Sequence, residues 1–210
     1  MYANNEYAKG MWDGTLPALE EYGIEAELVQ TFNDGTTDFT PQLLAIKNAG
    51  LDILFLYCYE AEQALVMRQL KELGMDNVKV LAGRGGDNPA VKELVGEQFM
   101  EGFVCSTSLS PGSPDPGIQE FVKKYEEKWK DELSPTHSNH YDSIYILADI
   151  IGRVGTDAEK ICNELRNLDY KGVLGHYQCD SKQDLVHTVY SHMYENGQWK
   201  LLNELKYPVE

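Results

Sequence analysis

The stretch DFTPQLLAIKNAGLDILFLY, residues 38–57, decides the fold class of this chain. Thr40 followed by Pro41 is a typical start of a helix, and Gly50 is a typical end. The next residues, Leu51–Tyr57, are almost all apolar, as expected of a parallel strand that is covered on both faces. The stretch therefore predicts a helix, capped by Thr40, that is followed directly by a buried strand.

The same alternation of helix and strand continues on both sides of this stretch. Upstream, apolar residues at helical spacing predict a helix that ends at Gly23, and a strand follows at Ile24–Thr31. Downstream, the pattern predicts a helix ending at Leu73, a strand at Val78–Ala82, a short helix capped at Asn88 and a strand at Gly102–Ser106. Repeated units of this kind predict an α/β fold with a parallel sheet and right-handed crossovers.

The composition changes after this region. The segment Leu109–Gly117 (LSPGSPDPG) is rich in proline and glycine, which predicts a loop and a boundary between lobes. Amphipathic helices are predicted over 118–168, the last of them starting with a capping box of Thr156 and Glu159. The chain then ends in a hairpin that turns at Asn196-Gly197. The expected organisation is an α/β domain at 1–106, a helical region at 107–186 and a C-terminal hairpin at 187–210.

Composition argues against several classes of function. The 210 residues include 34 acidic and 18 basic side chains, and the formal net charge of −16 disfavours nucleic acids and anionic membrane surfaces as partners. No apolar run approaches the roughly 18 residues that a membrane-spanning helix needs. The sequence has no phosphate-binding loop, no nucleophile motif and no CxxC pair. We therefore expect no enzyme, no cofactor and no metal site.

Two features predict that the chain is part of a longer protein. The helices at 118–168 have apolar faces, yet the sequence offers almost no strands for them to cover. The first residues, Met1–Ala3, look like the end of a strand, and no signal peptide is recognisable in this chain. We expect the apolar faces near Phe121–Trp129 and Tyr141–Ile151 to be exposed and to drive self-association.

Several segments, in this order along the chain, carry a family resemblance. They are EYAKGMWDGTLPALEEYG (6–23), DFTPQLLAIKNAGLDILFL (38–56), EGFVCSTSLSPGSPDPGIQEFVKKYEEKW (101–129), HYDSIYILADII (140–151) and LDYKGVLGHYQCDSKQDLVHTVYSHMYENGQWK (168–200). They resemble the leucine/isoleucine/valine-binding proteins of ABC transporters. The resemblance implies the type I periplasmic binding protein fold, in which two α/β lobes joined by three crossovers close around a ligand.

The resemblance also implies a role. This chain would hold most of the second lobe and only the late helices of the first. The intact protein would bind a branched-chain amino acid or a related small carboxylate outside the cytoplasm, either in the periplasm or anchored at the cell surface by lipid. It would deliver this ligand to an ABC permease in the membrane. A ligand-sensing receptor domain of the same fold is the alternative function.

Candidate ligand contacts lie where predicted strands end. Tyr59 and Glu60 follow the strand Leu51–Tyr57, and ligands of open α/β sheets bind beyond the carboxyl ends of strands. Tyr59 is predicted to contact the ligand, whereas Glu60 is also typical of a solvated residue at the start of a helix. By resemblance, Tyr7 would pack against the ligand side chain; the alternative is that it only packs on the lobe surface.

The loop Gly83–Asp87 follows the next predicted strand and is equally well placed. The resemblance implies an acidic residue that holds the ammonium of an amino acid, but Arg84 stands at that position. A guanidinium would repel an ammonium and would hold a carboxylate by two hydrogen bonds. Either Asp87 then holds the ammonium, or the ligand is an acid without an amine. The alternative is that Arg84 faces solvent or pairs with Asp87.

Overall fold

The computed structural model describes residues 1–173 and 175–205, the side chains of Thr136 and His137 excepted. The last five residues of the predicted hairpin segment, 206–210, therefore lie outside the described residues.

The described residues form two compact units. Unit 1 comprises Met1–Ser106 together with Met193–Gln198, and unit 2 comprises Thr107–His192 together with the residues from Trp199 onward. Of the C-terminal segment predicted at 187–210, only Met193–Gln198 therefore belongs to unit 1, which is the predicted α/β domain.

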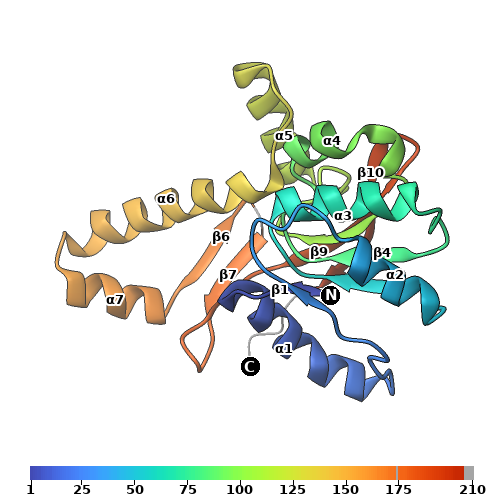
Figure 1. The fold of residues 1–210 in the computed structure, drawn as a ribbon. Helices are drawn as coiled ribbons and strands as arrows, with labels where there is room; N and C mark the ends of the chain where they lie inside the picture. Colours follow the sequence, from blue (N-terminus) through green and yellow to red (C-terminus); the bar gives the residue numbers. More distant parts are fainter. Residues whose placement is uncertain (174, 206–210) are drawn as a thin grey trace. The chain divides into compact units, whose positions relative to one another are not determined.

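Unit 1 is built on a parallel sheet (Figure 1). The pairs are β1 (Tyr2–Ala3) with β2 (Thr31–Phe32), β3 (Ile53–Leu56) with β4 (Lys79–Ala82), and β4 with β5 (Val104–Thr107). A parallel bridge between Tyr2 and Tyr57 joins the first pair to the end of β3. The predicted α/β fold with a parallel sheet is confirmed.

A helix follows each of the first four strands of unit 1. These are α1 (Glu6–Glu21), α2 (Thr40–Asn48), α3 (Glu60–Glu72) and α4 (Pro89–Val95), with a short 3₁₀ turn, η1 (Glu97–Phe99), after the last. Helices α3 and α4 pack side by side (Figure 1). Val66 and Leu70 of α3 are buried, as are Leu54, Leu56 and Val80 of the sheet. Burial of each such side chain contributes roughly 1.5–3 kcal/mol relative to exposure.

Two predictions in unit 1 are wrong in detail and one is confirmed. The strand predicted at Ile24–Thr31 forms only at its end, because β1, the strand beside it, pairs over two residues. Thr40 does not cap α2 but is its first residue, and Phe39 precedes it without a side-chain hydrogen bond. The cap at Asn88 is confirmed, since its side chain accepts a hydrogen bond of 3.0 Å from the amide of Ala90.

Unit 2 contains helices α5 (Pro116–Trp129), α6 (Pro135–Val154) and α7 (Ala158–Arg166), which share a core with the strands that follow them. The buried cluster consists of Leu109, Ile118, Leu133, Ile146, Ile150, Leu168, Tyr177 and Tyr190. Among the described helices of the chain, none is long and apolar enough to cross a membrane.

Unit 2 also contains a sheet that the sequence did not predict. Strands β6 (Asp169–Gly172), β7 (Gly175–Cys179) and β8 (Leu185–Val186) pair antiparallel in this order. The sequences DYKG and GHYQC contain glycines and charges and lack a clear alternation of apolar and polar residues, so they give a weak strand signal. This part of the region predicted as helical is a sheet instead, and it supplies Tyr177 to the core.

The cap of α7 also differs from the prediction. The Asp157 carboxylate accepts a hydrogen bond of 3.0 Å from the amide of Lys160, so Asp157 is the N-cap. The predicted capping box of Thr156 and Glu159 is therefore wrong by one residue, and aspartate takes the role that was given to threonine.

The predicted C-terminal hairpin is confirmed. Strands β9 (Val189–Glu195) and β10 (Gln198–Leu205) are neighbours and flank the turn at Asn196-Gly197. Within unit 1, the end of β9 continues the sheet beside β5: the amide of Gly102 donates to the carbonyl of Tyr194, and the amide of Tyr194 donates to the carbonyl of Phe103.

Candidate functional site

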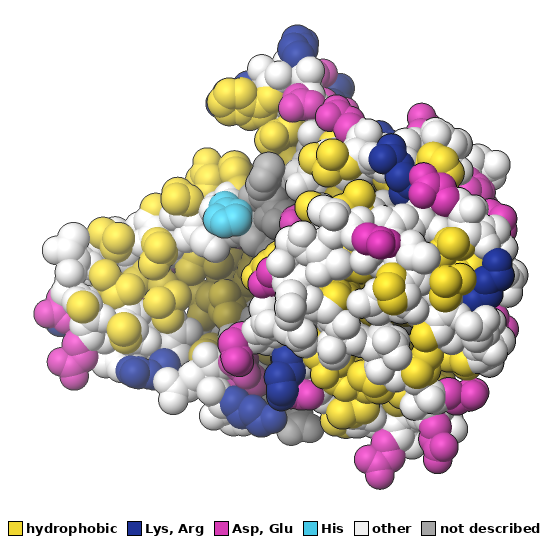
Figure 2. Space-filling view, viewed as in Figure 1, with side chains coloured by type: hydrophobic (Ala, Val, Ile, Leu, Met, Phe, Trp, Pro, Cys, Tyr) yellow, Lys and Arg dark blue, Asp and Glu magenta, His cyan; other side chains and the backbone are white. Residues whose placement is uncertain are grey.

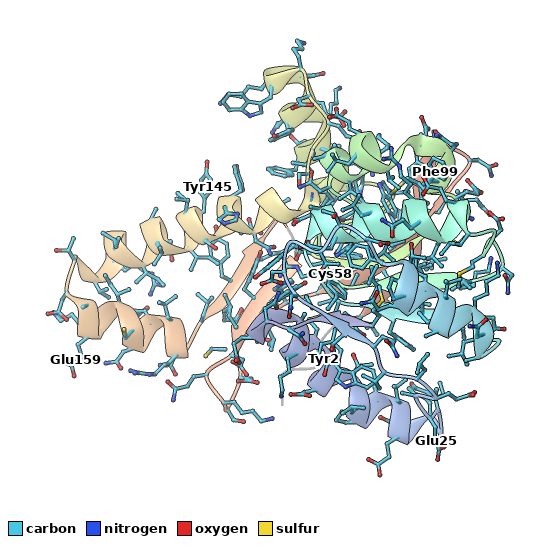
Figure 3. All side chains as sticks on the ribbon, in the orientation of Figure 1. Tyr2, Glu25, Cys58, Phe99, Tyr145 and Glu159 are labelled. Carbon is cyan, nitrogen blue, oxygen red and sulfur yellow. The ribbon has the colours of Figure 1, made fainter. Side chains whose placement is uncertain are left out.

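The candidate site lies at one edge of the sheet of unit 1. Strands β1, β3 and β4 run parallel, so their carboxyl ends meet at the edge where ligands of open α/β sheets bind. The chain leaves β1 into α1, which carries Tyr7, and leaves β4 into the loop Gly83–Asp87. It leaves β3 through Cys58, labelled in Figure 3, and then Tyr59 and Glu60 begin α3. The predicted site residues therefore come from connections at the same edge.

Tyr7 and Tyr59 form a stacked aromatic pair. Their ring centroids are 5.4 Å apart and their planes are inclined by 10°. Tyr7 is half-buried, whereas Tyr59 is 49% exposed, so the pair keeps an accessible ring. The Tyr7 hydroxyl lies 3.3 Å from the position that a Cβ of Gly83 would take, so glycine there makes room for the ring. The pair offers a flat apolar surface with hydroxyl groups at its rim.

Charges of both signs act on the Tyr7 hydroxyl. Burial raises the pKa of Tyr7, the positive charge of Arg84 opposes this shift, and the negative charge of Glu60 adds to it. Tyr7 therefore keeps its proton at neutral pH and can both donate and accept hydrogen bonds. The two charged residues thus lie close to the aromatic pair.

Glu60 lies against the loop that follows β4. It stands in the first turn of α3, where the helix dipole favours a negative charge. A Cβ at Gly85 would stand 2.8 Å from Glu60 Oε1, so a side chain there would displace the end of the Glu60 side chain. Gly85 also has a φ of +97°, a conformation that other residues rarely adopt. Glycine at this position therefore leaves room for the Glu60 carboxylate beside the loop.

The loop Gly83–Asp87 presents Arg84 on an anchored backbone. The amide of Gly83 donates to the carbonyl of Leu56 at 3.1 Å, and Nε2 of Gln63 donates to the carbonyl of Arg84 at 3.2 Å. The other residues of the loop are buried, whereas Arg84 is exposed. In the described part of the chain, Arg84 forms no ion pair. Its guanidinium therefore faces solvent.

Among the predicted site residues, Asp87 alone is buried. Its side chain is 4% exposed and is close to Cys105. Burial raises the pKa of the Cys105 thiol, and the negative charge of Asp87 adds to this shift. At this depth the carboxylate is not open to solvent. Contact between Asp87 and a ligand ammonium stays a prediction.

Gln63 supports the site but was not predicted from the sequence. Its side chain is fully buried, and Nε2 donates to the carbonyl of Cys58 at 2.9 Å as well as to that of Arg84. Gln63 thus joins the end of β3 to the loop after β4. A signal was present, because Gln63 precedes Val66 and Leu70 at the spacing of one helix face, and a polar residue on a buried face needs partners.

Each unit also has a hollow elsewhere. In unit 1 an apolar groove of about 240 Å³ runs between 24–30 and 51–55. In unit 2 a hollow of about 790 Å³ is lined partly by Tyr145, Tyr170 and the buried Asp142, which accepts a hydrogen bond of 2.9 Å from the hydroxyl of Tyr177. None of the described residues that line these hollows was predicted as a site residue.

Comparison with known proteins points to one family. A family model described as "Periplasmic binding protein" matches residues 1–198. The leucine-, isoleucine-, valine-, threonine- and alanine-binding protein of Pseudomonas aeruginosa is 24% identical over 186 residues, which are 88% of this chain and 49% of that protein. The chain thus spans about half the length of the curated relatives it matches.

Solved structures share the fold. A leucine-binding protein from Thermotoga maritima superposes with a TM-score of 0.85 and 29% identity, over 96% of this chain and 58% of that one. The substrate-binding protein of a branched-chain amino acid transporter from Streptococcus pneumoniae, solved with isoleucine, superposes with a TM-score of 0.82 and 22% identity, also over 96% of this chain and 58% of that one. These relatives are binding proteins rather than enzymes.

Proposed function

The chain belongs to the periplasmic binding protein family, and on this premise we propose that it is part of the solute-binding component of an ABC importer. The ligand is a branched-chain amino acid or a related small carboxylate, held between two lobes. Unit 1 is most of the second lobe in this proposal, and unit 2 is the remainder of the first. The component works outside the cytoplasm and passes its ligand to a membrane permease without changing it chemically.

The observation that carries this proposal is the stacked pair of Tyr7 and Tyr59 beside the exposed guanidinium of Arg84. Small-molecule sites combine apolar and aromatic walls with a few placed polar groups. A ligand with an apolar side chain and a carboxylate suits both parts of this surface, because rings bury the side chain and a guanidinium binds the carboxylate with two hydrogen bonds.

The proposal is tested by thermal shift of the 210-residue chain with leucine, isoleucine, valine and their analogues without the α-amine. A ligand at about 100 times its Kd adds roughly 2.7 kcal/mol to the free energy of unfolding. Replacement of the exposed ring in Tyr59→Ala should weaken binding roughly tenfold, since it removes an aromatic contact.

The matched control is Tyr22→Ala, which removes an exposed tyrosine next to the end of α1, outside the site. It should leave the binding affinity unchanged. If neither the amino acids nor their carboxylate analogues stabilise the chain, unit 1 by itself does not bind them, and the roles given to Tyr59 and Arg84 are contradicted. Equal losses in the two tyrosine variants would show that the site lies elsewhere.

A further inference from the structure

The apolar groove of unit 1 lies away from the candidate ligand site. It runs beside the amino end of β3, whereas the site lies at the carboxyl end of this strand. Its volume is about 240 Å³, and its walls are the segments 24–30 and 51–55. Side chains of α1 and α2, among them Trp12, Leu19 and Ile46, also line it. The proposed function does not use this groove.

One wall of the groove is an open edge of β3. The carbonyl of Asp52 accepts a hydrogen bond of 2.7 Å from the amide of Lys79 in β4. Because the backbone groups of a strand point alternately to its two sides, those of Ile53 and Phe55 point away from β4. The carbonyl of Phe55 accepts a hydrogen bond of 2.8 Å from the amino group of Met1. Among the described residues, none hydrogen-bonds to the backbone of Ile53 on this side.

The other wall offers backbone groups in the same register. The amide of Tyr2 donates to the carbonyl of Gln30 at 3.1 Å, and Tyr2 also forms a parallel bridge with Tyr57. Strand β1 is therefore paired on both of its sides. The walls of the groove precede these partners in the sequence, so the groove lies in line with β1. An extended segment placed there would pair with both walls, as β1 does.

Helices cover both faces of the groove. The pairing places the strands in the order β2, β1, β3, so the connection through α1 runs in one direction across the sheet and the connection through α2 runs in the opposite direction. Right-handed crossovers then put these two helices on opposite faces. A parallel strand that is covered on both faces is almost continuously apolar. The groove therefore suits apolar side chains at successive positions.

The groove also carries charges along its length. The acidic residues Glu25, Glu27 and Asp52 line it, all three are exposed, and its described lining includes no lysine, arginine or histidine. The amino group of Met1 lies at the other end. Burial lowers the pKa of this group to about 6, and a carboxylate beside it would favour the charged form. A peptide that runs parallel to β3 has its amino end near the acidic residues and its carboxyl end near Met1.

We propose that the groove binds an extended peptide as an additional parallel strand beside β3, with a basic amino end, an apolar middle and a free carboxyl end. About four apolar residues fill it, one opposite each of Asp52–Phe55, because paired strands have nearly the same rise per residue. Recognition of this kind takes its affinity from main-chain hydrogen bonds and its specificity from side-chain pockets. The inference is independent of the proposed function, because it concerns the opposite end of β3.

The test is isothermal titration calorimetry of the 210-residue chain at pH 6, where the Met1 amino group is partly charged. The probe is acetyl-KKVIVV with a free carboxyl end, and it should bind. Its amidated form and the acidic analogue acetyl-EEVIVV should each bind about tenfold more weakly, because each loses favourable charge interactions. The probe N-methylated at its isoleucine should show no measurable binding, because it lacks a backbone donor.

Two variants test whether the peptide lies in the groove. Ile53→Pro removes the amide on the open side of β3, leaves the hydrogen bonds to β4 in place and should abolish binding. Glu27→Gln combined with Asp52→Asn should weaken acetyl-KKVIVV about tenfold without weakening acetyl-EEVIVV, and it decides the question if the proline variant does not fold. The matched control, Glu72→Gln combined with Glu93→Gln, makes the same change of charge at exposed positions outside the lining and should leave both affinities unchanged.

Three results would overturn the inference and leave the proposed function untouched. They are equal affinities for the lysine and glutamate peptides, binding of the N-methylated peptide as tight as that of the probe, and no binding of any peptide. Pairing of the open edge with a second copy of the chain is a further contrary outcome. Light scattering would then find a dimer that Ile53→Pro converts to a monomer, and calorimetry would find no peptide binding.

Discussion

At position 85, the backbone conformation requires glycine, and the end of the Glu60 side chain lies beside it. The φ of Gly85 is +97°, and a Cβ would stand 2.8 Å from Glu60 Oε1. Gly85→Ala should therefore lower the free energy of unfolding by about 1–3 kcal/mol, the usual magnitude of backbone strain at such a residue. Urea denaturation measures this change.

The control for this prediction is another glycine, Gly14, which lies in α1 with open space around its Cβ position. Gly14→Ala should raise the free energy of unfolding by roughly 0.5–1 kcal/mol, because alanine is the better helix former. If alanine is tolerated equally well at position 85, the positive φ of Gly85 does not make glycine necessary there.

Tyr190 gives a prediction on pH. Burial raises the pKa of this residue to about 12, and the negative charges of Glu204 and Asp115 add to the shift. An unfolded tyrosine ionises near pH 10. Between about pH 10 and 12 the unfolded chain therefore loses a proton that the folded chain keeps, and the free energy of unfolding falls as pH rises, by up to about 1.4 kcal/mol per pH unit.

Tyr190→Phe removes the titrating group and keeps the ring, which is 3% exposed. The variant should lose less stability than the wild-type chain over this pH range in parallel urea titrations. Identical slopes in the two proteins would mean that Tyr190 ionises as easily in the folded chain as in the unfolded one.

At the scale of single residues, the sequence predicted which edge of the sheet the site residues lie at better than it predicted their contacts. Tyr59 and Arg84 follow apolar strands, and the carboxyl ends of parallel strands meet at one edge, so both could be placed there from the sequence. The burial of Asp87 could not be predicted, and the sequence indicated that Gln63 needs partners but not which ones, because both depend on how the loop after β4 packs against α3.

At the scale of elements, substitution tests which residue caps the N-terminus of α7. Asp157 accepts a hydrogen bond from the amide of Lys160, whereas Thr156 is exposed and outside the helix. Asp157→Ala should lower the free energy of unfolding by about 1 kcal/mol, the typical value for a lost N-cap. Thr156→Ala, measured in the same denaturation experiment, should have almost no effect. A larger loss of stability in Thr156→Ala than in Asp157→Ala would show instead that Thr156 caps the helix, as the sequence predicted.

Elements with strong patterns were predictable and weak ones were not. The apolar run of β3 and the Asn-Gly turn between β9 and β10 each identify their element from a few residues. The strands β6 and β7 carry no such pattern, and their pairing depends on contacts formed after α7. Strand β2 is shorter than predicted because its length depends on the strand beside it.

At the scale of the whole molecule, a large apolar surface remains exposed on unit 2. Figure 2 shows hydrophobic side chains gathered over α6 and α7. The exposed apolar residues of α6 are Tyr141, Ile144, Tyr145, Leu147 and Ile151. The sequence predicted an apolar stripe here, and self-association through it stays a prediction, which the net charge of −16 opposes.

Self-association can be tested at Ile144 of α6. This side chain is 67% exposed, more than the other exposed apolar residues of the helix. Light scattering should find oligomers of the 210-residue chain, and Ile144→Lys should shift them toward monomer, because a charge in an apolar interface is costly. Ser143→Lys adds the same charge at the neighbouring exposed position and should have a smaller effect. A monodisperse monomer of the wild-type chain would contradict this prediction.

We propose that a small ligand binds at the edge of the sheet in unit 1. Titration of the ¹⁵N-labelled 210-residue chain with L-leucine, followed by amide chemical shifts, tests it most directly. The largest shifts should occur at Tyr59–Glu60 and Gly83–Gly86. Shifts confined to the hollow of unit 2, around Tyr141–Asp142 and Tyr170–Val173, or no shifts at all, would contradict it.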